Sequence, residues 1–128
     1  MIYSDVIIVG GGPAGSACAA TLKKNGMDVK ILDKQVFPRQ KLCAGWISPD
    51  VFTDLGYSPD AYPHALTRIH RIHFHLCKVP LPVKTFQYAV RRIEFDHWLI
   101  RQANVPVYTH RVNTIQKKRH SNRASTIY

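Results

Sequence analysis

The sequence predicts an α/β fold whose first elements are a strand, a helix and a second strand parallel to the first. Three observations support this prediction. The apolar run Val6–Val9 is typical of a buried strand, a glycine-rich turn follows it directly, and Ser16–Lys24 has the composition of a helix. Asn25-Gly26 supplies a helix stop, because glycine adopts positive φ without strain. Val29–Asp33 then predicts the second strand, which ends in an acid.

The glycine-rich turn, Gly10 to Gly15, has the spacing G-x-G-x-x-G of a dinucleotide-binding turn. Gly10 permits the tight turn, Gly12 lets the backbone approach a pyrophosphate, and Gly15 lets helix and strand pack closely. The N-terminus of the helix would present free N–H groups and a partial positive charge to the phosphates. Asp33 would accept hydrogen bonds from a ribose 2′-hydroxyl, which favours FAD or NAD over NADP. The spacing does not separate FAD from NAD, and a plain βα turn of another α/β fold is the alternative.

A loop and a short helix are expected after the second strand. The stretch Lys34–Lys41 is basic and is broken by Pro38, which predicts a loop. Ser48 is a suitable N-cap for a helix that starts at Pro49 and runs to about Leu55. Gly56 would end this helix.

Strands are predicted in the middle of the chain. Period-two alternation over Leu66–Val79 predicts a half-buried strand. Its two faces carry Ile72, Phe74 and Leu76 on one side and Arg71, His73 and His75 on the other. Pro80-Leu81-Pro82 is expected to interrupt this strand, and Thr85–Val90 is expected to be its partner.

A second helix and a short strand are predicted towards the C-terminus. Arg92–Ala103 has a helical pattern, with Phe95 and Leu99 on one stripe. Val105–Tyr108 predicts a short strand, and Arg111–Ile115 a further one.

The histidines and cysteines do not form a recognisable metal motif. The predicted strand carries His70, His73 and His75 without a nearby carboxylate or cysteine. We therefore expect these histidines to form a solvated basic face of the strand and not a metal site. Three cysteines without C-x-x-C spacing argue against a disulfide scaffold and against a zinc site. Cys18, on the first helix, is expected to be a small buried residue.

The net charge of +10 on 128 residues is high, but its distribution does not predict nucleic-acid binding. Basic residues are spread along the chain, apart from Lys117–His120 with Arg123, and no RNA-binding aromatic motif or helix-turn-helix pattern accompanies them. No stretch approaches the ~20 apolar residues that span a bilayer, and no signal peptide is recognisable. A cytoplasmic protein is therefore expected.

Three stretches of the chain resemble the N-terminal part of the geranylgeranyl reductase family of FAD-dependent oxidoreductases. This family belongs to the flavoprotein group of the para-hydroxybenzoate hydroxylase-like monooxygenases. The stretches are YSDVIIVGGGPAGSACAATLKKNGMDVKILDK, the loop FPRQKLCAGWI, and YAVRRIEFDHWL, which is similar to the family's R-x-x-F-D-x-x-L helix. The resemblance covers residues 2 to about 116. It implies an incomplete Rossmann-like FAD/NAD(P)-binding domain together with the start of an antiparallel β substrate domain.

The resemblance also implies the cofactor contacts and the reaction. FAD would be held by Gly10, Gly12, Pro13, Ala14, Gly15, Asp33, Lys34, Arg39, Cys43, Ala44, Arg92 and Val112. Without the resemblance, Arg92 would be read as a surface residue of its helix. Cys43 is a weak catalytic candidate, and its alternative is a packed side chain in a cofactor loop. The implied activity is hydride transfer from the flavin to isoprenoid double bonds, with an external electron donor and contact with a membrane surface.

The chain departs from the family at Trp46 and in its length. Many members have a small residue at the position of Trp46. Members are several times longer, and their second FAD motif, a Gly-Asp pair, has no counterpart here. We therefore expect a truncated chain that is inactive alone and binds flavin weakly or not at all. A short stand-alone nucleotide-binding or interaction module and an aromatic monooxygenase fragment are the alternatives.

The expected organisation of the chain has four parts. They are a FAD-binding portion with the cofactor loop over 1–57, an inserted β segment over 58–91, a return to the FAD-binding domain over 92–116, and an atypical basic tail over 117–128.

Overall fold

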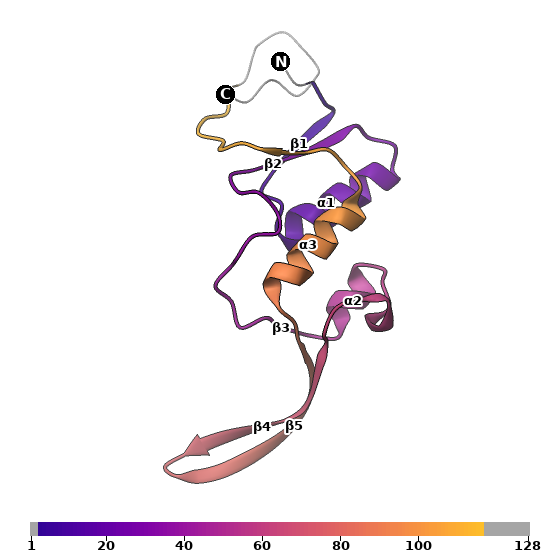
Figure 1. The fold of residues 1–128 in the computed structure, drawn as a ribbon. Helices are drawn as coiled ribbons and strands as arrows, with labels where there is room; N and C mark the ends of the chain where they lie inside the picture. The colour runs from indigo at the N-terminus through magenta and orange to yellow at the C-terminus, as the bar shows by residue number, and fades with distance from the viewer. Residues whose placement is uncertain (1–2, 117–128) are drawn as a thin grey trace. The chain divides into compact units, whose positions relative to one another are not determined.

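A computed structural model of the protein describes residues 3–116 (Figure 1). The elements in chain order are β1 (Val6–Val9), α1 (Pro13–Lys24), β2 (Val29–Asp33), β3 (Trp46–Ile47), α2 (Asp50–Asp54), η1 (Pro59–Ala61), β4 (Thr67–Leu76), β5 (Val79–Ala89), α3 (Arg92–Ala103) and β6 (Val107–Thr109). They divide into two compact units. The first unit is Met1–Arg39 with Asp96–Tyr128, and the second unit is Gln40–Phe95.

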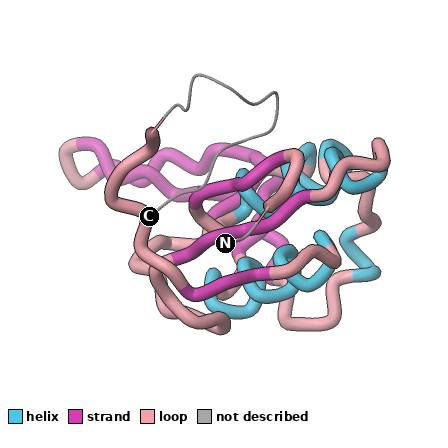
Figure 2. Tube along the Cα trace, turned by 90° about the horizontal axis from the view of Figure 1, so that it is seen from above, coloured by secondary structure: helices cyan, strands magenta, loops and turns pink. Residues whose placement is uncertain are grey.

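The first unit contains a parallel sheet, which confirms the predicted α/β class. Its strand order is β1-β2-β6, with Val6 opposite Val29 and Ile31 opposite Val107. Helices and strands alternate along the chain here, as Figure 2 shows in cyan and magenta. The core of the unit consists of side chains from α1, β2 and the later turns of α3, namely Ala19, Val29, Ile31, Ile100 and Ala103. Burying apolar side chains of helices against a parallel sheet is the main stabilising contribution in such a layer.

Helix α1 begins three residues earlier than predicted and ends where predicted. Pro13 occupies its first turn, where the missing N–H costs nothing. At the other end Gly26 has φ +79° and donates to the carbonyl of Lys23, while Met27 donates to Leu22. This pattern is a Schellman stop. The expectation of a buried Cys18 is wrong, since its side chain is exposed on the outer face of the helix.

The second unit contains an antiparallel sheet of strand order β3-β5-β4. The prediction that Pro80-Leu81-Pro82 interrupts the strands is wrong, because both prolines lie within β5, opposite His75 and His73. Residues two apart in a strand direct their N–H groups to the same side, so both prolines lack an N–H on one side of β5. No described strand pairs with β5 on that side at these positions, since β3 pairs only with Tyr88 and Ala89, and no ladder hydrogen bond is therefore lost.

The β4–β5 hairpin turns at Cys77 and Lys78, and it extends beyond β3 as a two-stranded ribbon (Figure 1). Both turn residues have positive φ, of 49° and 67°, as a two-residue type I′ turn requires. The alternation predicted for β4 is present, but its apolar face is not half-buried. Phe74 is 54% and Leu76 is 65% exposed, because no other described element of this unit covers that face.

An aromatic cluster forms the core of the second unit. Phe52 of α2 is fully buried and meets Tyr62, Tyr88 and Phe95 edge-to-face, with ring centroids 5.6 to 6.2 Å apart. Helix α2 is shorter than predicted. Pro49 is its N-cap, and the expected cap by Ser48 is wrong by one residue.

The C-terminal predictions are confirmed in part. β6 overlaps the strand predicted over Val105–Tyr108 but begins two residues later and ends one residue later, whereas residues 111–115 form no strand. The predicted basic tail over 117–128 lies outside the described residues. Among the described helices, none combines the length and apolarity that crossing a membrane requires.

Replacing Phe52 by alanine is expected to lower the free energy of unfolding by about 3–5 kcal/mol, because the substitution leaves a cavity among three rings. Urea unfolding followed by tryptophan fluorescence would measure the change. Phe74→Ala is the matched control, since this ring is half exposed, and its expected cost is within about 0.5 kcal/mol. Equal costs for the two substitutions would contradict the assignment of Phe52 to the core.

Candidate functional site

The glycine turn joins the carboxyl end of β1 to α1. Gly10 has φ +99°, and its N–H donates to the carbonyl of Leu32 at 2.8 Å. A Cβ on Gly15 would lie 1.9 Å from the carbonyl oxygen of Gly10, so only glycine allows this approach of helix and strand. The predicted conformational roles of Gly10 and Gly15 are thus present in the structure.

Gly12 differs from the other glycines of the turn, because the fold does not require it. Its φ of −71° suits any residue, and a Cβ there would make an ordinary contact, 3.5 Å from Nη2 of Arg39. The space beside its α-carbon faces this guanidinium. Sequence reasoning assigned no role to Gly11, yet a Cβ there would lie 2.6 Å from Ile100 and 3.0 Å from Phe37. In the sequence, the run of three consecutive glycines, Gly10 to Gly12, was the signal that neighbouring side chains approach this turn closely.

Asp33 ends β2 and is buried beside the glycine turn. Its Oδ2 accepts a hydrogen bond from the N–H of Gly11 at 2.7 Å, and its Oδ1 accepts one from the N–H of Gln35 at 2.9 Å. Each carboxylate oxygen has a further lone pair for another donor. The strand end therefore places one carboxylate next to the turn that would hold a phosphate.

Arg39 lies between two buried carboxylates. Its Nε is 3.8 Å from Oδ2 of Asp33, and its Nη2 is 4.0 Å from Oδ2 of Asp96. The guanidinium also lies over the ring of Phe37, 4.9 Å from the centroid. The Nε is buried and makes no hydrogen bond within the described part of the chain. Asp96 was expected only as a motif residue; the structure buries it completely and pairs it with Arg39.

These groups suit an anion that carries a ribose. The first turn of α1 contains no acidic residue, and its N-cap, Gly12, has no side chain to satisfy the helix N–H groups. The partial positive charge of the helix N-terminus is therefore available to a phosphate. Arg39 adds a buried cation with an unused donor on the same side of the turn, and Asp33 adds an acceptor for a hydroxyl.

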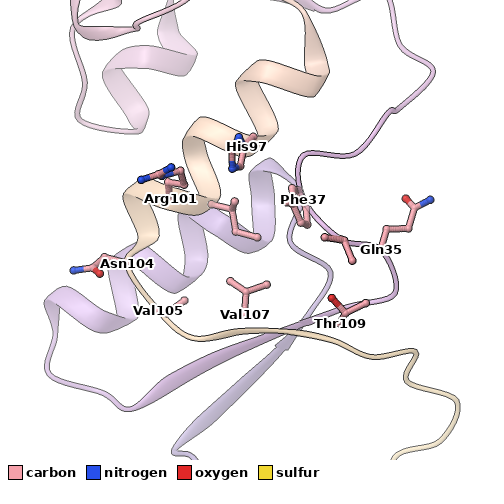
Figure 3. A pocket seen from close by; sticks show the side chains of 10 residues that line it. Gln35, Phe37, His97, Arg101, Asn104, Val105, Val107 and Thr109 are labelled. Carbon is pink, nitrogen blue, oxygen red and sulfur yellow. The ribbon is translucent and has the colours of Figure 1, made fainter.

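The first unit contains a pocket of about 460 Å³ (Figure 3), and two of its lining residues are neighbours of Asp33. Gln35 follows the hydrogen-bonded end of β2, and Thr109 pairs with Asp33 in the sheet. The lining residues are Gln35, Val36, Phe37, His97, Ile100, Arg101, Asn104, Val105, Val107 and Thr109. Apolar surface with a few amide and cationic donors suits a planar heteroaromatic group.

In the second unit, the structure brings together Cys43 and Arg92, which sequence reasoning took from two separate motifs. Nη1 of Arg92 donates to Sγ of Cys43 at 3.3 Å, and the N–H of Gly45 donates to the same sulfur at 3.5 Å. Gly45 has φ +72°, and a Cβ there would lie 1.9 Å from the carbonyl oxygen of Val90. The N–H of Val90 donates to the carbonyl of Gly45 at 2.9 Å. The cysteine loop is thereby held against the chain that enters α3.

The other predicted residues lie apart from these contacts. Lys34 and Ala44 are exposed, and Val112 is partly buried outside any helix or strand. His70, His73 and His75 are exposed on β4, where the ring of His70 stacks on Phe86. Within residues 3–116, no group of three or more potential ligands from His, Cys, Asp and Glu could hold a metal ion.

Gly15→Ala is expected to lower the free energy of unfolding by on the order of 3 kcal/mol, because the new methyl group collides with backbone. Gly12→Ala is the matched control and should cost at most about 1 kcal/mol, the difference between the two residues at an N-cap. Urea unfolding of both variants would test this contrast. A tolerated alanine at position 15 would contradict the close approach of α1 and β1.

Arg39→Met is expected to cost on the order of 3 kcal/mol, because it removes a cation from two buried carboxylates. Arg68→Met is its control, since Arg68 pairs with Asp60 at the surface at 3.2 Å and should contribute less than about 1 kcal/mol. Thermal and urea unfolding would measure both variants. If the two losses are equal, the charge pairs around Arg39 are not a stabilising feature.

Comparison with known proteins agrees with this geometry. Residues 8–78, more than half of the chain, match the family described as NAD(P)-binding Rossmann-like domain. The geranylgeranyl diphosphate reductase of Rhodobacter capsulatus is 32% identical over 100 residues, which cover 77% of this chain and 25% of the reductase.

Two solved structures are similar over 91% of this chain, and each match spans 32% of the other protein. The flavin-dependent brominase Bmp2 is 26% identical, with a TM-score of 0.76. A geranylgeranyl bacteriochlorophyll reductase-like protein of Thermoplasma acidophilum has a TM-score of 0.80 at 19% identity, a likeness of fold. The chain thus spans only a quarter to a third of these proteins. It belongs to the NAD(P)-binding Rossmann-like domain family, and its relatives within that fold include a geranylgeranyl reductase and a flavin-dependent halogenase.

Proposed function

We propose that this chain holds the ADP half of FAD for an oxidoreductase that reduces isoprenoid double bonds. The observation that carries this proposal is the surroundings of Arg39. The guanidinium of Arg39 faces the space beside Gly12 through its Nη2, its buried Nε makes no hydrogen bond among the described residues, and no side chain of the glycine turn intervenes. A buried donor without a hydrogen bond is costly, and a phosphate oxygen would offer this guanidinium an acceptor.

Each part of the ADP half has a candidate partner in the first unit. The pyrophosphate would be bound by the N-terminus of α1, with Gly10, Gly12 and Gly15 shaping the turn. Asp33 would accept hydrogen bonds from the adenosine ribose, and the pocket lined by Gln35 and Asn104 would take the adenine. The cofactor contacts assigned by resemblance to Pro13, Ala14, Lys34, Cys43, Ala44, Arg92 and Val112 remain predictions.

FAD is favoured over other dinucleotides by two considerations. The buried carboxylate of Asp33 would repel the 2′-phosphate of NADP. One of the similar proteins, the brominase Bmp2, is named as flavin-dependent, which favours FAD over NAD. When bound, the flavin supplies the redox chemistry, and the chain contributes binding and orientation. Cys43 is our only candidate for a side chain at the reacting centre.

The substrate class follows from the reductase relative. The named substrate of that relative carries a geranylgeranyl group, and we propose an isoprenoid substrate for this protein as well. Because the chain spans 25% of the reductase, we expect little activity and weak flavin binding from these 128 residues alone.

Flavin-dependent halogenation is a second candidate, which the match to the brominase favours. It requires the same cofactor, so the assignment of the ADP site is common to both reactions. The reductase is preferred because two relatives named as geranylgeranyl reductases match the chain, at 32% and 39% identity, whereas a brominase compared in the same way is 30% identical.

The cofactor assignment can be tested by saturation-transfer NMR on the 128-residue chain, a method that detects weak ligands. FAD and ADP are expected to receive saturation and to compete with each other, and NADP should compete less well because of Asp33. Gly12→Ala is expected to weaken FAD binding by about tenfold or more, because the methyl group lies where the phosphate would approach.

Arg68→Met serves as the control in the same experiment and should bind FAD as the natural chain does. Unfolding measurements on Gly12→Ala would separate a binding defect from a folding defect. The proposal fails if ADP receives no saturation, or if Gly12→Ala binds FAD unchanged. Purification of the chain with stoichiometric yellow flavin would contradict the expectation of weak binding.

A further inference from the structure

Three contacts restrain the guanidinium of Arg39 in the first unit. Its Nε lies 3.8 Å from Oδ2 of Asp33, and its Nη2 lies 4.0 Å from Oδ2 of Asp96. Its Cζ lies over the ring of Phe37, 4.9 Å from the centroid. The ring blocks one side of the guanidinium, and the carboxylates attract two different nitrogens. Together these contacts oppose both tilting and rotation of the charged group.

The nitrogen that Asp96 attracts is also the nitrogen that borders the glycine turn. Nη2 of Arg39 would lie 3.5 Å from a Cβ at Gly12, whereas Nε is the nitrogen paired with Asp33. The open space beside Gly12 is where a phosphate of the proposed cofactor would approach. Asp96 therefore acts on the donor that borders the phosphate side of the turn.

The two carboxylates are held in different ways. Asp33 accepts backbone N–H groups on both oxygens, from Gly11 on Oδ2 and from Gln35 on Oδ1, so it is fixed to the end of β2. Asp96 lies in α3 and is completely buried, which is rare for an ionised side chain unless a cation is paired with it. Ile100, one turn further along the helix, belongs to the core of the unit and fixes this part of α3.

We propose that Asp96 is a positioning residue, which holds the guanidinium of Arg39 in the orientation that binds the pyrophosphate. This role rests on the proposed function, because it requires that the ADP half of FAD binds at the glycine turn. Asp96 would not touch the cofactor and would act only through Arg39. An arginine side chain has many rotamers, so an orientation fixed before binding reduces the entropy that binding must remove.

The buried carboxylate of Asp96 also has an opposing effect, because its negative charge repels a phosphate. Positioning and repulsion predict opposite results when this charge is removed. Positioning predicts weaker binding of a phosphate, and repulsion predicts tighter binding. Positioning is favoured because Asp96 pairs with the same nitrogen of Arg39 that borders Gly12.

Asp96→Asn tests the proposal, because it removes the charge and keeps the size of the side chain. Binding of ADP and of adenosine to the 128-residue chain would be compared by NMR titration at one salt concentration. We expect the dissociation constant of ADP to rise about tenfold, since a misdirected guanidinium bonds the phosphates less well. The affinity for adenosine should stay the same, because adenosine contains no phosphate. A merely structural role of Asp96 would weaken both ligands alike.

Glu94→Gln is the matched control for this substitution. Glu94 is an acid of the same helix, and its partner Arg91, at 2.8 Å, is 73% exposed. Removing this surface charge should leave the affinities for ADP and adenosine unchanged. Urea unfolding would verify that both variants fold.

Should Asp96→Asn fail to fold, the natural chain offers a second measurement. The buried Nε–H of Arg39 should give a resolved proton–nitrogen NMR signal, because burial in a fixed orientation slows its exchange with water. The signal would be identified by its loss in Arg39→Lys. We expect ADP to shift this signal and adenosine to leave it in place.

The results separate this role of Asp96 from the proposed function. ADP binding that Asp96→Asn leaves unchanged or strengthens would overturn the positioning role alone, as would an equal loss for ADP and adenosine. In the second measurement, absence of the Arg39 signal, or an equal shift with both ligands, would also overturn it. Failure of the natural chain to bind ADP would overturn the proposed function together with the role of Asp96.

Discussion

The ion pairs of Arg39 are the interaction on which the arrangement of the candidate site depends. Charges buried in a protein interior require compensation, because the loss of hydration costs several kcal/mol per ion. Arg39 lies within 4.0 Å of Asp33, at the end of β2, and of Asp96, in α3. The loop after β2, the strand end and the helix are therefore linked by the same cation. The ring of Phe37 beneath the guanidinium further limits its movement.

The glycine turn complements this arrangement through the absence of side chains. Gly15 and Gly11 are required by neighbours that leave no room for a Cβ, whereas Gly12 leaves open space towards Arg39. The turn is thus crowded where it contacts protein and open where a ligand would approach. The same residue type serves packing at one position and binding at another, and the contacts around each α-carbon distinguish the two roles.

The two units bury apolar side chains to different extents. In the first unit, apolar side chains of β2 are fully buried under helices, as is usual in a parallel sheet. In the second unit, apolar burial is concentrated around Phe52, which Tyr88 of β5 contacts, while most other side chains of β4 and β5 are exposed on both faces. Alternation predicts a two-faced strand, but whether an apolar face is covered depends on what packs against it.

The sequence by itself determined the βαβ unit, its glycine turn and the acid at the end of β2, because these features rest on local spacing, helix stops and positive-φ glycines. The sequence also indicated the helix Arg92–Ala103, because the spacing of apolar residues within this segment is likewise a local feature. Only the tertiary structure decided that Asp96 pairs with Arg39 and that Cys43 meets Arg92, since these contacts join residues 57 and 49 positions apart. Likewise, Pro80 and Pro82 could be recognised as strand residues only from the pairing of β5, because proline is excluded from a strand interior and accepted at an open edge.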